Sequence, residues 1–171
     1  FEQGEESIPP QLLLSNCADI WAVDGFETKC RPYPLNFWEQ IRVRPEKELI
    51  NLSASPFVFN KFELKLKLWG AQCAKFQKQL IYVNTCTASD DLLMDGRSFV
   101  LNPNGKLVFE GKVFQEEIKA IDTQKENDVE PLKLTDDELA FEGIVFGIKR
   151  YFQNMGNPKA ILGVSGGIDS A

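Results

Sequence analysis

The chain has 171 residues, of which 43% are hydrophobic and 26% charged, and its formal net charge is −6. This composition is typical of a globular protein and excludes a disordered tail or a collagen-like fibre, and no apolar run approaches the ~20 residues of a membrane helix. The excess of 25 acidic over 19 basic side chains argues against nucleic acid as the main partner. Because histidine is absent, Ser-His-Asp and Cys-His catalysis and histidine-bound metal are excluded within these residues.

The four cysteines, Cys17, Cys30, Cys73 and Cys86, form no Cys-x-x-Cys pair. Neither a zinc site nor a dithiol redox motif is therefore indicated. Cysteine is sparse and no secretory leader is recognisable, so we expect reduced thiols in a cytoplasmic protein.

Short apolar runs in the first half of the chain indicate buried strands. They predict strands over residues 11–15, 49–54 and 80–84. Proline-rich stretches predict loops over 1–10 and 31–34, because alternate prolines cannot hold a helix.

Between these strands, residues 59–78 contain no proline and are rich in lysine, leucine and alanine, which predicts a helix. The sequence Asn-Pro-Asn-Gly at 102–105 strongly favours a turn and predicts a hairpin of strands 98–101 and 106–109. A further strand and its exit are expected over 113–121.

Residues 123–134 are polar and contain a proline, which predicts a surface linker between two domains. Thr135 and Glu138 have the spacing of a capping box that opens a helix. The fully apolar run 160–164 then predicts a buried strand.

A glycine-rich turn follows that last predicted strand and is the sharpest signal in the sequence. It comprises Ser165, Gly166, Gly167, Ile168, Asp169 and Ser170. Paired glycines allow close backbone approach to a ligand, and a following helix N-terminus favours an anion such as phosphate. The pattern is not a Walker loop, and its alternative interpretation is an ordinary strand-to-helix turn.

This hexapeptide resembles the pyrophosphate-binding loop of the N-type ATP pyrophosphatases. With residues 147–151 and 160–163 before it, the segment looks specifically like an NAD synthetase. The resemblance implies that Ser165, Gly166, Gly167, Asp169 and Ser170 bind ATP, with Mg²⁺ as cofactor and no protein metal site. It also implies that ammonia attacks the adenylate of nicotinic acid adenine dinucleotide.

Upstream residues resemble the nitrilase-like amidase domain of the glutamine-dependent form. Residues 51–57 match an Asn-x-Ser-x-Ser-Pro strand end, 82–84 and 95–100 match the next strand and hairpin, and 17–21 match the stretch around the nucleophile. Only 22–48 match poorly. By this resemblance Cys17 is the nucleophile and Ser55 and Lys61 hold the amino-acid end of glutamine. The other interpretations are a buried packing thiol for Cys17 and a solvated helix lysine for Lys61.

Several departures from the family pattern bear on activity. Ala18 stands where the family often has a glutamate, which weakens the expected hold on the glutamine amino group. In the family a glutamate base and an oxyanion lysine precede the cysteine by long stretches, whereas 16 residues precede Cys17. We therefore expect a piece of a longer enzyme that is inactive by itself.

The predicted fold is α/β. It combines a partial nitrilase-like α-β-β-α sandwich (1–122) and a linker (123–134) with the first helix and strand of a doubly wound ATP pyrophosphatase domain (135–171). The function implied is part of a glutamine-dependent NAD synthetase, a cytoplasmic homo-oligomer when complete, with no nucleic acid or membrane partner. The alternatives are a stand-alone nitrilase-type carbon-nitrogen hydrolase and a non-catalytic binding or regulatory piece.

Overall fold

The computed structural model describes residues 12–23, 36–123 and 129–170, so the predicted loops over 1–10 and 31–34 lie outside the described residues. Strands and helices alternate in the first half, and a long helix follows the sheet. The strands are β1 (Leu13–Asn16), β2 (Glu48–Ser53), β3 (Gln79–Asn84), β4 (Cys86–Ser89), β5 (Leu92–Asp95), β6 (Phe99–Leu101) and β7 (Leu107–Glu110). The helices are α1 (Phe37–Ile41), α2 (Lys61–Phe76) and α3 (Asp136–Asn154), with short 3-10 turns η1 (Cys17–Trp21) and η2 (Ile168–Ser170).

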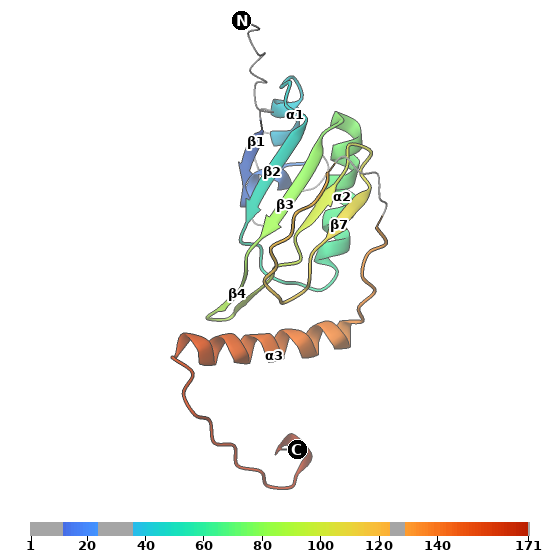
Figure 1. Cartoon of the computed structure of the whole chain (residues 1–171). Helices are drawn as coiled ribbons and strands as arrows, with labels where there is room; N and C mark the ends of the chain where they lie inside the picture. The colour runs from blue at the N-terminus through green and yellow to red at the C-terminus, as the bar shows by residue number, and fades with distance from the viewer. Residues whose placement is uncertain (1–11, 24–35, 124–128, 171) are drawn as a thin grey trace, which may run out of the picture.

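The main sheet has the order β1-β2-β3-β6-β7, with β1, β2 and β3 parallel and β6 and β7 antiparallel (Figure 1). Parallel neighbours need a crossover, and α2 supplies it between β2 and β3. The sheet confirms the predicted α/β class. Each predicted strand of this sheet is confirmed to within two residues at either end.

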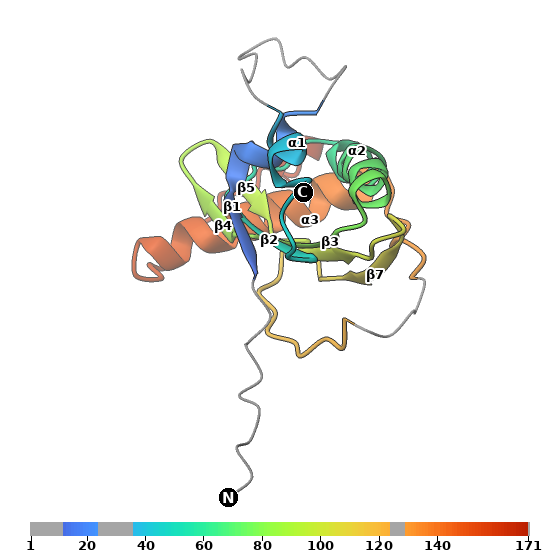
Figure 2. The same cartoon turned by 90° about the horizontal axis from the view of Figure 1, so that it is seen from above.

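Helices α1 and α2 lie on the same side of the sheet, as the view from above shows (Figure 2). The core between the sheet and these helices holds fully buried Trp38, Trp69 and Leu80. On the opposite side of the sheet Leu14 is 70% exposed and Leu52 is 52% exposed. The strands are therefore buried on one face, which gives the alternation of buried and exposed positions along β1.

The predicted helix over 59–78 is confirmed as α2, and Gln77 ends it with a left-handed φ of 51°. Gly70 lies where α2 meets the hairpin turn after β6. A Cβ atom at Gly70 would stand 2.8 Å from the carbonyl oxygen of Gly105, so only glycine allows this approach.

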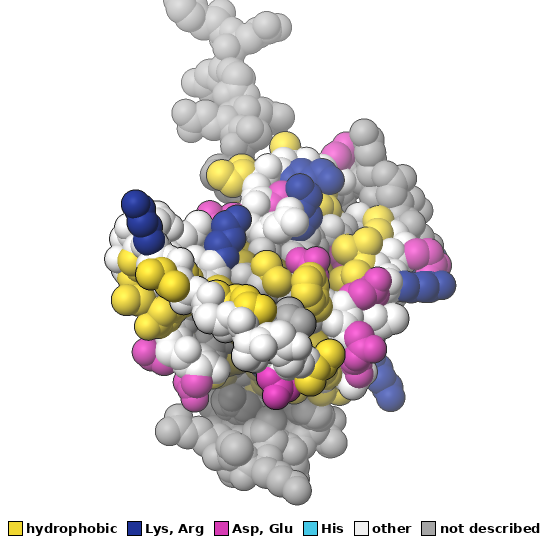
Figure 3. All heavy atoms as spheres, turned by 90° about the horizontal axis from the view of Figure 1, so that it is seen from below, with side chains coloured by type: hydrophobic (Ala, Val, Ile, Leu, Met, Phe, Trp, Pro, Cys, Tyr) yellow, Lys and Arg dark blue, Asp and Glu magenta, His cyan; other side chains and the backbone are white. Residues whose placement is uncertain are grey.

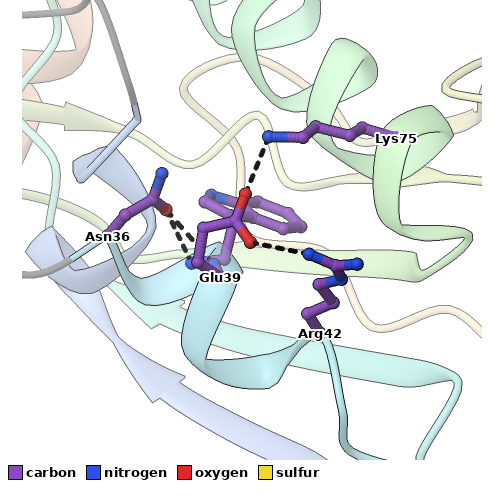
Figure 4. Close-up of polar contacts among 5 residues, drawn as sticks. Asn36, Glu39, Arg42 and Lys75 are labelled. Carbon is purple, nitrogen blue, oxygen red and sulfur yellow. Dashed lines mark hydrogen bonds and ion pairs between the residues drawn. The ribbon is translucent and has the colours of Figure 1, made fainter.

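Helix α1, which the sequence did not predict, is joined to α2 by side-chain contacts (Figure 4). Asn36 Oδ1 accepts hydrogen bonds from the backbone N–H groups of Trp38 and Glu39 and so caps the helix. Glu39 forms ion pairs with Lys75 of α2 at 2.8 Å and with Arg42 at 3.8 Å. These pairs are largely exposed, so burial of Trp38 contributes more to the docking of α1.

Helix α3 begins with the predicted capping box, in which Thr135 Oγ1 accepts from the Glu138 N–H at 3.2 Å. It packs on the β4–β5 hairpin through a small second core, where Leu139 and Phe146 contact Phe114 and Leu93. Most of its other apolar side chains are exposed, and the view from below shows hydrophobic side chains on this side of the molecule (Figure 3). These exposed residues are Phe141, Ile144, Val145, Ile148 and Tyr151.

Two predicted strands are wrong. Residues 160–164 form no strand, and Ile161 and Leu162 are 100% and 80% exposed. No neighbouring strand pairs with them, and an extended segment alone has no partner for its backbone groups. Over 113–121 only Val113 forms a bridge, to Gly96, because Phe114 turns the chain with a left-handed φ of 54°.

Among the described residues, no helix combines the length and the apolar character needed to cross a lipid bilayer.

Candidate active site

Cys17 lies directly after the carboxyl end of β1, where the chain leaves the sheet into η1. Its φ is 36°, a left-handed conformation that costs about 1 kcal/mol or more for a residue with a side chain. The turn is held by the Asn16 N–H, which donates to Asp19 Oδ2 at 2.9 Å. The Cys17 side chain is half-buried. The Cys17 thiol therefore lies on a strained turn just beyond the end of a buried strand.

Ser55 follows the carboxyl end of the neighbouring strand β2, and its position is fixed by Asn84 at the end of β3. The Ser55 N–H donates to Asn84 Oδ1 at 2.8 Å, and Asn84 Nδ2 donates to the Ser55 carbonyl at 3.2 Å and to Asp95 Oδ1 at 2.9 Å. All three side chains are buried. Because parallel strands end at one edge of the sheet, β1, β2 and β3 bring Cys17, Ser55 and Asn84 to the same edge.

Lys61 begins α2 at this edge, and its ammonium donates to the Pro56 carbonyl at 2.9 Å. Burial lowers the pKa of Lys61, while the negative charges of Asp95 and Cys17 oppose this shift. The ammonium also lies 5.9 Å from the centre of the Trp21 ring. The structure therefore places Lys61 at the same edge of the sheet as Cys17 and Ser55.

Lys65 and Tyr82 form a buried pair in this region that the sequence reasoning missed. Lys65 Nζ donates to Tyr82 Oη at 2.9 Å and lies 4.6 Å from the centre of its ring. Burial lowers the pKa of Lys65 to about 8 and raises that of Tyr82 to about 12. A signal was present in the sequence, because Lys65 shares its face of α2 with the buried Trp69 and Cys73.

Polar side chains on the strands continue the hydrogen bonding toward Cys17. Ser53 Oγ donates to Asn51 Oδ1 at 2.7 Å, and Asn51 Nδ2 donates to Ser15 Oγ at 2.9 Å. Ser15 stands two residues before Cys17 and is buried. Ser15, a polar residue in a strand with apolar neighbours, therefore has a hydrogen-bond partner on the adjacent strand β2.

The other described cysteines, Cys73 and Cys86, are free thiols like Cys17. Cys73 is fully buried, and burial raises its pKa far above the usual thiol range. Burial also raises the pKa of Cys86, which is half-buried under α3. Cys30 lies outside the described residues. Of the three thiols described, Cys17 alone follows a strand end beside lysines.

The glycine-rich turn at 163–170 lies beyond α3, away from the sheet (Figure 1). Gly166 has φ +83°, and a Cβ atom there would have nothing within 4 Å. The Gly167 N–H donates to Ser165 Oγ at 3.4 Å, and Asp169 and Ser170 lie in η2. The structure thus does not bring this turn to the Cys17 region.

Within the described ranges, no group of three or more cysteine, aspartate or glutamate side chains is placed to hold a metal ion.

The comparisons with known proteins agree with one another. No family model matches the chain. The chain is 32% identical to the glutamine-dependent NAD(+) synthetase of Synechocystis sp. over 94% of its length, and 32% identical to that of Rhodobacter capsulatus over 100%. It spans about 30% of the length of each of these relatives.

Solved structures give the same relationship. The chain matches glutamine-dependent NAD+ synthetase from Acinetobacter baumannii, solved with adenosine diphosphate, with a TM-score of 0.75 and 27% identity. This match covers 93% of the chain and 29% of that protein. A carbon-nitrogen hydrolase from Helicobacter pylori, 18% identical, shares the fold with a TM-score of 0.50, over 63% of this chain and 38% of that protein. The nitrilase-like fold is thereby confirmed, and the chain is a homologue of the glutamine-dependent NAD(+) synthetases over nearly its whole length.

Proposed function

We propose that the chain carries the nucleophile and the amino-acid contacts of the glutamine-hydrolysing site of an NAD synthetase. The observation that supports this most is the position of Cys17, on a strained turn at the end of a buried parallel strand, at the edge of the sheet where α2 begins with Lys61. The homologues are glutamine-dependent NAD(+) synthetases, which agrees with a thiol of this kind.

The chemistry proposed is hydrolysis of the glutamine side-chain amide. The Cys17 thiolate attacks the amide carbon, the carbon–nitrogen bond breaks, and the nitrogen takes up a proton and leaves as ammonia. Water then adds to the thioester, glutamate is released, and the thiol is restored.

Ser55 and Lys61 are proposed to hold the amino-acid end of glutamine. The Lys61 ammonium now donates to the Pro56 carbonyl, and it has two further protons for a substrate carboxylate. Burial of the lysine strengthens such a charge-assisted bond relative to one in water. Ala18 offers no carboxylate for the substrate amino group, so we propose weak binding of glutamine.

The turn at 163–170 is proposed as the ATP phosphate contact, and its local geometry agrees with that role. A Cβ atom at Gly163 or Gly166 would have nothing within 4 Å, and Gly166 already has the positive φ that a phosphate cradle uses. Ser165, Gly167, Asp169 and Ser170 are the proposed partners of the phosphates. Mg²⁺ would then be held by phosphate oxygens of the bound ATP. The dinucleotide substrate, nicotinic acid adenine dinucleotide, is proposed from the relatives.

The proposal is tested by labelling with the diazoketone analogue of glutamine, which alkylates a thiol only after the amino-acid end has bound. Peptide mass spectrometry on the folded chain then shows which cysteine carries the label. We expect labelling of Cys17, competed by glutamine and weakened in Lys61→Met, while Lys67→Met, changed at an exposed lysine of the same helix, labels like the native chain.

Cys86 is the internal control, because it is half-buried like Cys17 but lies under α3. Equal labelling of Cys17 and Cys86, or labelling of Cys17 that glutamine does not reduce, would overturn the proposed function and favour a non-catalytic piece.

A further inference from the structure

Asp95 is a buried carboxylate that none of the roles proposed above uses. It stands at the end of β5 and is 7% exposed. Within the described part of the chain, the side chain that donates to it is Asn84, whose Nδ2 lies 2.9 Å from Asp95 Oδ1. Burying a charge is costly, and a neutral side chain at this position would avoid that cost. The carboxylate therefore indicates a specific task.

The turn that begins with Asp95 holds Asn84 at two points. Asp95 accepts from the Asn84 side chain, and Ser98 Oγ accepts from the Asn84 backbone N–H at 3.0 Å. Asp95 itself is held by two neighbouring segments, because it pairs with Cys86 of β4 and its carbonyl accepts from the Phe114 N–H at 2.8 Å. The backbone that carries the carboxylate is therefore fixed in place.

Asn84 in turn holds both backbone groups of Ser55. Its Oδ1 accepts from the Ser55 N–H at 2.8 Å, and its Nδ2 donates to the Ser55 carbonyl at 3.2 Å. Burial raises the pKa of Asp95, while the positive charge of Lys65 opposes this rise and favours the ionised form. An ionised carboxylate only accepts hydrogen bonds, so it fixes the Nδ2 end of the Asn84 amide and leaves Oδ1 for the Ser55 N–H.

We infer that Asp95 is a positioning residue for glutamine binding, which fixes the backbone of Ser55 through Asn84. The inference rests on the proposed function in taking Ser55 as a contact of the amino-acid end. A charge-assisted hydrogen bond is about twice as strong as a neutral one, so the carboxylate holds Asn84 more firmly than an amide would. Because Asp95 acts through Asn84, its loss should weaken binding of the amino-acid end and leave the Cys17 thiol unchanged.

The experiment compares two reagents on Cys17 of the folded full chain, with peptide mass spectrometry as the readout. The diazoketone analogue of glutamine has an amino-acid end and iodoacetamide has none, so only the analogue reports the position of Ser55. The variants are Asp95→Ala, Asp95→Asn, Asn84→Ala and the double variant with alanine at both positions. Asp91→Ala is the matched control, because Asp91 is exposed in the same β4–β5 hairpin. Circular dichroism establishes that each variant is folded.

In Asp95→Ala we expect the analogue concentration that gives half the maximal labelling rate to rise about tenfold, the order expected for loss of one hydrogen bond to a charged group. The maximal labelling rate and the iodoacetamide rate should stay native. Asp95→Asn should give a smaller rise, because an amide oxygen still accepts from Asn84, and Asp91→Ala should give none. In the Asn84→Ala background, Asp95→Ala should add nothing, because its effect passes through Asn84.

Hydrogen exchange of the Ser55 N–H, followed by NMR, tests the same link without a reagent. We expect Asp95→Ala and Asn84→Ala to accelerate this exchange relative to the amides of β3, which report general loosening. Exchange at Ser55 that stays native in the Asp95 variants would overturn the inference. Should Asp95→Ala fail to fold, Asp95→Asn carries both measurements.

Equal changes with the two reagents would also overturn the inference, and so would additive effects of the Asp95 and Asn84 substitutions. Failure of this inference is distinguishable from failure of the proposed function. If glutamine competes for Cys17 in the native chain while the Asp95 variants label like the native chain, only the role of Asp95 is refuted. If glutamine does not compete in the native chain, the proposed function fails and the role of Asp95 falls with it.

Discussion

Replacing Asn84 by alanine tests whether this one side chain holds the candidate site together. Asn84 is 6% exposed and makes three hydrogen bonds, two to the backbone of Ser55 and one to Asp95. Alanine leaves the Ser55 N–H, the Ser55 carbonyl and the Asp95 carboxylate without this partner in a buried region. At about 1 kcal/mol per bond, the expected loss of unfolding free energy is about 3 kcal/mol.

Urea unfolding followed by tryptophan fluorescence measures this loss, because Trp38 and Trp69 are fully buried in the core. Asn104→Ala is the matched control, since Asn104 is exposed in the turn after β6. It should change the free energy of unfolding by less than about 0.5 kcal/mol. The same Asn84 variant should label more slowly with the glutamine analogue, because Ser55 is no longer held.

Equal stability of Asn84→Ala and Asn104→Ala would refute the reasoning, because three buried groups would then have lost a partner without cost. A loss of about 3 kcal/mol in Asn84→Ala with unchanged labelling would show that Asn84 supports the fold and not the position of Ser55.

Three further results are expected, each measured by urea unfolding. Gly105→Ala should cost clearly more than Gly156→Ala, because the two glycines have φ of +79° and +80° but only a Cβ at Gly105 would stand 2.2 Å from a backbone oxygen; equal costs would contradict the packing of α2 on the hairpin. Phe146→Ala should lose about 3 kcal/mol and the exposed Phe141→Ala less than about 1 kcal/mol, and the reverse order would mean that α3 packs through its other face. The pKa of Lys65 is about 8 when folded and 10.5 when exposed, so the unfolded chain binds more protons between these values. The stability of the native chain relative to Lys65→Met should therefore rise by up to about 3 kcal/mol between pH 8 and 10.5. A difference that does not change with pH would show that burial does not lower the pKa of Lys65.

The strands of the main sheet were predictable because their signal is local. Leu49, Leu80 and Leu101 stand in short apolar runs bounded by turn residues, which is how buried strands read in a sequence. The hairpin over 102–105 was predictable for the same reason, since Gly105 must adopt a positive φ. Local patterns therefore gave most of the elements that lie in the sheet.

Elements that depend on distant partners were not predictable. Most residues of the β4–β5 hairpin are half-buried, and α3, which covers them, lies some fifty positions further along the chain. Helix α1 is five residues long and owes its place to Trp38, whose indole N–H donates to the Ile20 carbonyl at 3.0 Å. For residues 160–164 the error is the reverse: the apolar pattern predicts a strand, but no partner strand among the described residues pairs with it.

The candidate site divides in the same way. Cys17, Ser55 and Lys61 are predicted from motif order, and the structure shows that strand ends and the start of α2 lie at one edge of the sheet. Lys65 and Tyr82, the buried pair in the same region, carry no motif. Their signal is a lysine on the buried face of α2, which is visible only once that face is known.

The buried polar residues at this edge have a common physical cause. Asn51 and Asn84 stand at strand positions that face the core, where apolar residues would stabilise the sheet at lower cost. Each asparagine side chain bonds to a neighbouring segment, Asn51 to Ser15 and Asn84 to Ser55. Ser15 lies two residues before Cys17, and Ser55 is itself a proposed site residue. When such buried polar atoms are fully hydrogen-bonded, they fix the positions of the strand ends relative to one another. Apolar packing alone is less directional and would let the strand ends shift. The edge that carries Cys17, the proposed nucleophile, therefore also carries this hydrogen-bond network.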